Sequence, residues 1–333
     1  MEYRKTEKDG VYVFLLKNES NQVYVTNYGA TLLSWLVIDG HNNLQDIVLG
    51  YDTIEDYARY DGYLGACLGR VANRIAEGRF VLDGQEYKVP VNNGPNSLHG
   101  GVQGFSYKTF GYDMIGDSCV RFSLVSPDGD QGYPGTLHVS ITYRLENDTL
   151  SIHYQAQSDA DTLVNLSNHA YFNLDGACAI GEHCLRIAAE KFAPVDENGL
   201  VSKELKVLGE AMDFSSEKPI REALGSNDSD IAIAKGLDHP YVFASKKDPV
   251  TLYSPKSGLE LVLNTSYPLA QIYTANYLDG RCGKHGVQME AQGAICLEAQ
   301  YMPDDIHRDP HSKTILRKGE TYDEWTSFTI RKR

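Results

Sequence analysis

Five short polar segments contain the side chains whose types could do chemistry. They are centred on Asn73 and Arg74, on His99, on His169, on Asp238 and on Glu298. Histidines and carboxylates can transfer protons, and an arginine fork can hold hydroxyl groups or a carboxylate. No phosphate-binding glycine loop accompanies them. This combination predicts general acid/base chemistry on a polar, uncharged molecule, for which a sugar is the natural candidate.

His169 lies at the centre of residues 165–174, where a β-type run over residues 162–166 gives way to a turn-prone segment ending in Asp175-Gly176. A histidine at such a strand edge is often a structural hydrogen-bonding residue, and it can equally serve as an acid or base. Its own segment therefore leaves both roles open.

Glu298 follows the apolar run of residues 294–297, and Gln300 shares its face because strand side chains alternate. Pro303 then ends the strand. A carboxylate at the end of a buried strand is costly unless it has partners, which favours a functional role. His99 heads a Gly100-Gly101 turn that allows the backbone to approach a ligand closely. Asp238 lies in a proline-containing turn, where an aspartate is also common for structural reasons.

Alternating apolar and polar residues predict the elements that must position these groups. Strands are expected at residues 11–16, 22–26, 30–37, 137–145, 150–156, 185–189, 259–263, 272–274, 294–297 and 326–331. Residues 80–82 and 85–87 flank Asp83-Gly84, the signal of a hairpin with a type I′ turn. Short helices are expected only at residues 54–60 and 219–224. The pattern predicts an all-β protein, a large antiparallel β-sandwich, with residues 1–333 forming a single domain.

The composition excludes several classes of partner. The net charge of −14 repels phosphate backbones and anionic lipids, so we expect neither nucleic acid nor membrane as partner. The charged first ten residues lack an apolar signal core, and we expect a cytoplasmic protein. Six cysteines without a CxxC motif predict buried free thiols. Cys178, His183 and Cys184 could be imagined as metal ligands, but no second cluster at zinc spacing accompanies them, so no metal is expected.

Taken together, the motifs resemble those of the aldose 1-epimerase family. The resemblance spans nearly the whole chain and rests on Asn73-Arg74-Ile75 with Gly78-x-Phe80, Asn96-Ser97-Leu98-His99-Gly100-Gly101, Asn168-His169-x-Tyr171-Phe172, Asp238-His239, Gln271-Ile272-Tyr273-Thr274 and Glu298-x-Gln300-x-x-Pro303-Asp304. It implies a β-sandwich that interconverts α and β anomers of galactose, glucose and related aldoses without a cofactor. A sugar is then the expected partner, and the protein is expected to be a monomer or a homodimer.

The resemblance also implies roles for individual residues. Glu298 is expected to be the general base at the anomeric hydroxyl, and His169 the general acid at the ring oxygen. A bell-shaped pH profile should follow, with activity lost when Glu298 gains a proton and when His169 loses one. The residues expected to bind the sugar are Asn73, Arg74, His99, Tyr171, Asp238 and Gln271.

Three questions stay open at this point. An asparagine is more usual in the family near His307, so the resemblance assigns nothing beyond Asp304, and relatives acting on sugar phosphates also exist. A glycoside hydrolase could use Asp238 and Glu298 as its two carboxylates. A non-catalytic sugar-binding module would need only tyrosine-rich walls and polar donors.

Overall fold

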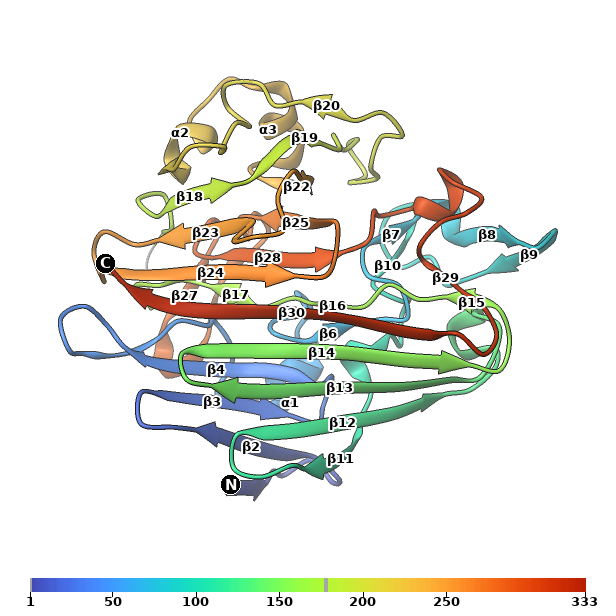
Figure 1. Ribbon diagram of the computed structural model, residues 1–333, viewed down its shortest axis with the longest axis horizontal. Helices are drawn as coiled ribbons and strands as arrows, with labels where there is room; N and C mark the ends of the chain where they lie inside the picture. The colour runs from blue at the N-terminus through green and yellow to red at the C-terminus, as the bar shows by residue number, and fades with distance from the viewer. Residues whose placement is uncertain (1, 177–178) are drawn as a thin grey trace.

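The computed structural model describes residues 2–176 and 179–333, and antiparallel strands are its main regular elements (Figure 1). The largest sheet has nine strands in the order β11 (Gly111–Met114), β12 (Cys119–Ser126), β13 (Leu137–Glu146), β14 (Thr149–Ser158), β30 (Thr321–Lys332), β24 (Leu259–Thr265), β23 (Val250–Tyr253), β18 (Cys184–Ile187) and β21 (Lys218–Pro219). The second has six strands in the order β17 (Tyr171–Phe172), β28 (Ile295–Gln300), β25 (Leu269–Tyr273), β22 (Asp238–Phe243), β19 (Ala189–Phe192) and β20 (Lys206–Val207). The third contains β1 (Glu2–Lys5), β2 (Tyr12–Lys17), β3 (Asn21–Thr26), β4 (Thr31–Ile38) and β5 (Leu44–Asp46).

Smaller elements join these sheets. Two-stranded pairs are formed by β6 (Cys67–Leu68) with β16 (Ser167–Asn168), β7 (Arg74–Ile75) with β10 (Ser97–Leu98), β8 (Arg79–Leu82) with β9 (Gln85–Lys88), β15 (Thr162–Leu163) with β29 (Ile315–Leu316), and β26 (Asp279–Cys282) with β27 (Gln288–Glu290). The α-helices in the described residues are α1 (Ile54–Arg59), α2 (Ile220–Leu224) and α3 (Ser229–Ala234). None of the described helices has the length and apolar character needed to cross a membrane.

The interior lies between the sheets and follows the predicted alternation. In β13 the inward residues from Leu137 to Leu145 are all buried, and the intervening residues are exposed or half-buried. They join one apolar core with residues of β2, β24, β28 and β30. The large antiparallel β-sandwich predicted from the sequence is confirmed. The expectation of a single domain over residues 1–333 stays a prediction.

Strand β28 has two differently used faces. Ile295, Leu297 and Ala299 point into the main core. The alternate residues Cys296 and Glu298 lie on the opposite face, yet both are at least 98% buried. The candidate site is therefore built on β28, which buries the Glu298 carboxylate on the face that points away from the main core.

The Asp83-Gly84 hairpin is confirmed between β8 and β9. Both turn residues have positive φ angles, 52° for Asp83 and 81° for Gly84, as a type I′ turn requires. Glycine adopts such angles without steric cost, and aspartate tolerates them better than most residues.

The single strand predicted at residues 185–189 is wrong, because this run crosses between two sheets. It divides into β18, which ends at Ile187 in the nine-stranded sheet, and β19, which begins at Ala189 in the six-stranded sheet. The N–H of Ala188 donates to Pro249 O, and its carbonyl accepts from Ala244 N. Residue alternation is unchanged across this crossing, so the sequence pattern does not reveal it.

Two short helices are confirmed, and a third was missed. Helix α3 begins after Asp228, whose side chain accepts hydrogen bonds from the backbone N–H groups of Asp230 and Ile231. Its polar first residues resemble a turn, which hides the helix from a search based on apolar periodicity.

The prediction of buried free thiols holds in part. The five described cysteines are free, and Cys67, Cys119 and Cys296 are buried. Cys184 is half-buried and Cys282 is exposed, so burial was wrong for these two. Cys282 ends a strand of the two-stranded β26–β27 hairpin, where no second sheet covers it. Cys178 lies outside the described residues.

Candidate active site

The register of three strands places polar groups beside Glu298. In the pairing of β25 with β28, Gln271 lies opposite Glu298 and Tyr273 lies opposite Cys296. The pairing of β22 with β25 then sets Asp238 opposite Tyr273. The Gln271 amide donates to Asp238 Oδ1 at 2.6 Å, so adjacent strands connect the two carboxylates.

His169 stands between β16 and β17, and backbone hydrogen bonds fix its position. Its N–H donates to Ala66 O, and its carbonyl accepts from Gly65 N, both at 2.9 Å. The ring stacks on Tyr171 with centroids 4.9 Å apart and planes 19° apart. Tyr63 also stacks on the ring, with centroids at 6.1 Å.

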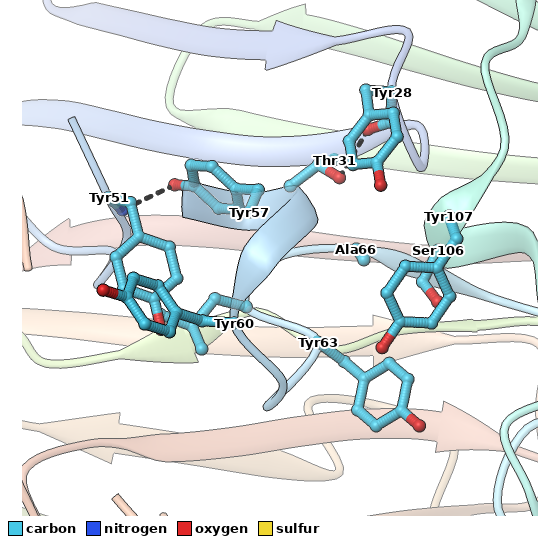
Figure 2. A pocket seen from close by; sticks show the side chains of 10 residues that line it. Tyr28, Thr31, Tyr51, Tyr57, Tyr60, Tyr63, Ala66, Ser106 and Tyr107 are labelled. Atoms are coloured by element: carbon cyan, nitrogen blue, oxygen red, sulfur yellow. Dashed lines mark hydrogen bonds between the residues drawn. The ribbon is translucent and has the colours of Figure 1, made fainter. Parts of the chain in front are cut away.

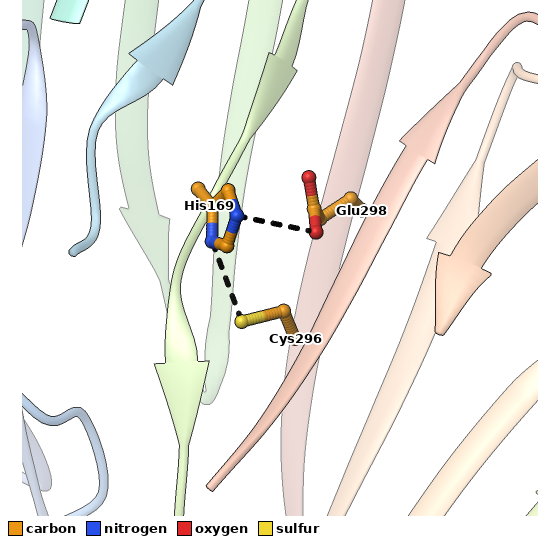
Figure 3. Close-up of side chains that lie close together, drawn as sticks. All are labelled: His169, Cys296 and Glu298. Atoms are coloured by element: carbon orange, nitrogen blue, oxygen red, sulfur yellow. Dashed lines mark hydrogen bonds and ion pairs between the residues drawn. The ribbon is translucent and has the colours of Figure 1, made fainter. Parts of the chain in front are cut away.

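The two ring nitrogens of His169 face different partners. Nε2 lies 3.6 Å from Glu298 Oε1, and Nδ1 lies 3.4 Å from Cys296 Sγ (Figure 3). His169 and Glu298 are 6% and 2% exposed, so solvent screens their interaction little. The two residues expected to exchange protons with a ligand are therefore neighbours in a buried site.

Burial changes the protonation of both groups. Desolvation lowers the pKa of His169 to about 4, so its ring is a neutral imidazole at neutral pH. Desolvation and the nearby Asp238 charge raise the pKa of Glu298 well above its ordinary value, and Arg74 opposes this increase. Burial thus argues against an alkaline limb from His169, which a measured pH profile would test.

His99 presents a defined nitrogen to the site. Its Nδ1 accepts a hydrogen bond from the backbone N–H of Asn73 at 3.1 Å. A neutral ring with an accepting Nδ1 carries its proton on Nε2. Burial lowers the pKa of His99 well below its usual range, and the Arg74 charge lowers it further, as would a proton on His169. His99 is therefore neutral, and its ring lies 5.4 Å from that of His169.

Arg74 and Asn73 stand at the start of the β7–β10 pair. The Arg74 guanidinium donates to Asn93 Oδ1 at 3.0 Å and to Gly199 O at 2.9 Å. Asn73 Oδ1 accepts from the Arg74 N–H at 2.8 Å. The charge of Arg74 counteracts the increase that burial causes in the pKa of Asp238, which places its field inside the pocket.

All eight residues selected from the sequence are thus tied to this region, but Tyr171 takes part differently from the others. Its hydroxyl donates to Gly62 O at 2.8 Å, and its ring face is the one stacked on His169. This geometry favours orientation of the imidazole over a direct contact with a sugar hydroxyl.

Three further residues belong to the site. Tyr63 meets the His99 ring edge-on at 4.6 Å, Tyr273 meets His169 edge-on at 5.9 Å, and Cys296 contacts Nδ1 of His169. Alternation along β28 could have indicated Cys296, which lies two residues from Glu298. Tyr63 carries no sequence signal beyond the glycines around it.

Several buried polar atoms of the site have no hydrogen-bond partner within the described part of the chain. They are Glu298 Oε2, Gln271 Oε1 and both amide atoms of Gln300. Burying such atoms without partners costs about 1–3 kcal/mol each. A bound water or ligand with hydroxyl groups would supply the missing donors and acceptors.

A second, tyrosine-lined cavity adjoins this site through Tyr63 (Figure 2). Its walls include Tyr51, Tyr57, Tyr60 and Tyr107, and its volume of about 10 Å³ has room for about one water molecule. It contains neither His169 nor Glu298, so it is a neighbour of the candidate active site and not the site itself.

The possible metal-ligand atoms of His169, Cys296 and Glu298 lie within 4.8 Å of one another. Imidazole nitrogen, thiolate sulfur and carboxylate oxygen are all ligands that zinc binds. The imidazole, however, directs one nitrogen to the sulfur and the other to the carboxylate (Figure 3). One ring nitrogen would have to serve a metal, whereas here one nitrogen is engaged by the sulfur and the other lies 3.6 Å from the carboxylate, an arrangement that does not favour a metal site. The sequence also offered Cys178, His183 and Cys184 as conceivable metal ligands. Cys178 lies outside the described residues, and Nε2 of His183 accepts a hydrogen bond from the backbone N–H of Leu174.

This β-sandwich buries an imidazole beside a carboxylate, with a second carboxylate nearby, an arrangement suited to acid/base chemistry on a polar ligand. The family model described as aldose 1-epimerase matches residues 12–329. The galactose mutarotase of Bos taurus is 40% identical over 95% of this chain and 94% of its own length. The aldose 1-epimerase of Haemophilus influenzae is 37% identical over 95% and 94%.

Solved structures agree with the sequence relatives. An aldose epimerase homologue from C. elegans superposes with a TM-score of 0.90 at 31% identity, over 96% of this chain and 98% of that one. A galactose 1-epimerase from Lactobacillus acidophilus gives 0.88 at 29% identity, over 99% and 98%. The chain belongs to the aldose 1-epimerase family and is therefore an isomerase.

Proposed function

We propose that this enzyme interconverts the α and β anomers of galactose, glucose and related aldoses by opening and reclosing the sugar ring. The observation that carries the proposal is the 3.6 Å separation of His169 Nε2 from Glu298 Oε1 in a buried site. The anomeric hydroxyl oxygen and the ring oxygen are bonded to the same carbon. Two groups this close together can therefore reach both oxygens at once.

In the proposed reaction Glu298, as carboxylate, takes the proton from the anomeric hydroxyl. His169 donates its Nε2 proton toward the ring oxygen, the bond from that oxygen to the anomeric carbon breaks, and an open-chain aldehyde forms. Rotation about the bond next to the aldehyde carbon exposes its other face. The same two groups then work in reverse, and each assisted transfer contributes roughly a hundredfold or more.

His169 acts here as a neutral imidazole, because burial lowers its pKa to about 4. A neutral ring is a weaker acid than an imidazolium, but it can still share its proton with an oxygen on which negative charge develops. Glu298, whose pKa burial raises, becomes a correspondingly stronger base once ionised. The stronger base offsets the weaker acid.

The remaining polar groups suit recognition of sugar hydroxyls. His99 offers an Nε2–H donor, Asp238 a carboxylate acceptor, and Gln271 an amide held by Asp238. Arg74 adds a cation whose field reaches both carboxylates. Asn73 supports the assembly by fixing the ring of His99 through its backbone N–H.

Polarimetry of freshly dissolved α-galactose and α-glucose tests this function and ranks the two sugars. We expect the rotation to reach its equilibrium value faster with enzyme than in buffer. Release of reducing sugar from a glycoside would identify a hydrolase using Asp238 and Glu298 instead. Binding of galactose without any acceleration would identify a sugar-binding module. Galactose 1-phosphate in the same assay tests whether sugar phosphates are accepted.

We further propose that residues 1–333 form one domain and that the protein acts in the cytoplasm as a monomer or homodimer. The five described cysteines are free thiols, which supports a reducing compartment. Light scattering with size-exclusion chromatography would give the mass in solution. A larger assembly would contradict the last part of this proposal.

A further inference from the structure

Cys296 makes a buried contact with the ring of the proposed acid. Its sulfur lies 3.4 Å from Nδ1 of His169, within hydrogen-bonding distance for sulfur (Figure 3). The Cys296 side chain is fully buried, and β28 places it on the same face as Glu298. The imidazole therefore lies between two residues of one strand.

The thiol side of this contact is neutral. Burial raises the pKa of Cys296 well above its ordinary value, and the nearby charges of Glu298 and Asp238 raise it further. The sulfur therefore carries a hydrogen that it can donate. The ring is also neutral and has one N–H and one bare nitrogen. Either Cys296 donates to Nδ1, or Nδ1 donates to the sulfur.

The environment of the second ring nitrogen decides between these arrangements. Nε2 faces Glu298 Oε1, which has lone pairs and accepts hydrogen bonds when ionised. While Glu298 is ionised, the form in which it would act as the base, a bare Nε2 would set its lone pair against that oxygen, whereas an Nε2–H is attracted to it. Sulfur is also a weak acceptor, so little is gained by directing the ring proton toward it.

His99 provides an internal parallel. Its Nδ1 also accepts a hydrogen bond, here from the backbone N–H of Asn73, and its proton is therefore on Nε2. In both histidines Nδ1 would thus accept a supporting hydrogen bond, and Nε2 would carry the proton that faces the ligand. A backbone donor supports one, and a thiol supports the other.

We propose that Cys296 is a positioning residue whose S–H donates to Nδ1 of His169 and thereby keeps the ring proton on Nε2, where the reaction needs it. The consequence for catalysis rests on the proposed function, since it takes His169 as the acid. The tautomer itself does not depend on any turnover. Without the thiol, the proton can move to Nδ1, and the ring then meets the sugar as an acceptor.

Nitrogen NMR of protein with ¹⁵N-labelled histidine tests the tautomer directly. In the unmodified protein we expect His169 and His99 both to show a protonated Nε2 and a bare Nδ1 at neutral pH. Cys296→Ser keeps a hydroxyl donor and should keep this pattern, whereas Cys296→Ala should shift His169 toward a mixture of tautomers. His99 should be unchanged in every variant. A protonated Nδ1 on His169 in the unmodified protein overturns the proposal.

Kinetics provides the second readout. Cys296→Ala should lower kcat about tenfold with KM nearly unchanged, and Cys296→Ser should recover most of that loss. Cys119→Ala removes another fully buried thiol from β12, away from the site, and should leave kcat unchanged. A Cys296→Ala enzyme with unchanged tautomer and unchanged kcat would refute the positioning role.

The two readouts separate this inference from the proposed function. If the protein fails to accelerate mutarotation but Cys296→Ala still changes the His169 tautomer, the proposed function fails and the thiol contact stands. If the protein is active but its tautomer and rate do not respond to Cys296, the function stands and this inference fails. Circular dichroism and thermal melting identify any variant that loses its fold.

Discussion

Two buried polar regions of this protein differ in how well their charges are satisfied. Arg70 is 2% exposed, yet all three guanidinium nitrogens donate hydrogen bonds. Their acceptors are Ser126 Oγ and O, Pro127 O, Pro134 O, Gly135 O and Thr162 Oγ1. In the candidate active site, by contrast, Glu298 Oε2 and Gln271 Oε1 are buried with no partner in the described residues.

This difference indicates that the surroundings of Arg70 are structural and that those of Glu298 are not. A charge surrounded by protein acceptors has no remaining need for a ligand, so Arg70 serves to hold loops together. Burial lowers the pKa of Arg70 to about 10, which still leaves it charged at neutral pH. The unpaired carboxylate and amide oxygens beside His169 suit the proposal that a polar molecule binds there. The following variants test this contrast.

Glu298→Gln should have the largest effect, because it removes the proposed base while keeping the size and shape of the side chain. We expect kcat for mutarotation to fall by at least about a hundredfold. Polarimetry on fresh α-galactose measures the rate, and circular dichroism checks the fold. An unchanged rate in the folded variant would remove Glu298 from the mechanism.

Arg70→Met should reverse this pattern by lowering stability while sparing catalysis. It leaves several buried carbonyl oxygens without donors, so the free energy of unfolding should decrease by about 3 kcal/mol or more. Activity per folded molecule should be unchanged. Urea denaturation and polarimetry on the same sample measure both quantities. Loss of activity without loss of stability would contradict the structural role.

The sequence predicted much of the framework and put forward Arg74, not Arg70, as a candidate site residue, but it did not show what surrounds each arginine. Alternation correctly predicted β13, β14 and the Asp83-Gly84 hairpin, because each pattern is local. Arg70 and Arg74 lie four residues apart on one segment. Which of them reaches the pocket depends on distant loops, such as the one that supplies Pro134 O to Arg70. Local patterns do not contain that information.

The same reason explains what was missed around His169. Its ring contacts come from Tyr63, Cys296 and Tyr273, which lie in three distant parts of the chain. The fold argues against the expected alkaline limb of the pH profile for a related reason. An ordinary histidine pKa applies to a solvated ring, and only the assembled fold shows that this ring is buried.

The pH dependence of kcat/KM should have one limb, not two. Activity should rise as Glu298 loses its proton, at a pH above the ordinary glutamate range because burial and Asp238 raise its pKa. No fall at higher pH should come from His169, which is already neutral above about pH 4. Profiles recorded in buffers from about pH 4 to about pH 9 check this. A fall in activity near neutral pH that disappears in a His169 variant would contradict it.

Arg74→Met should shift the acid limb of the kcat/KM profile, whereas Arg70→Met should change stability and leave catalysis unchanged. The charge of Arg74 keeps the pKa of Glu298 and of Asp238 lower than burial alone would leave them. Removing it should move the limb to higher pH and lower kcat/KM about tenfold at neutral pH, a change of about 1.4 kcal/mol. Thermal melting should change less than in Arg70→Met. An unshifted limb would place Arg74 outside the electrostatic environment of the base.

The smallest effect we expect is a gain in stability from Glu298→Gln. It tests whether the ionised Glu298 carboxylate lowers the free energy of unfolding. A carboxyl group whose pKa is higher in the folded state contributes stability only while it is protonated. That contribution is complete below the unfolded-state pKa and is lost as pH rises through the folded-state pKa. The variant, which cannot ionise, should therefore melt a few degrees above the unmodified protein at alkaline pH and at the same temperature at acid pH. Differential scanning calorimetry at both pH values measures this, and equal melting temperatures throughout would mean that the carboxylate is as well satisfied as Arg70.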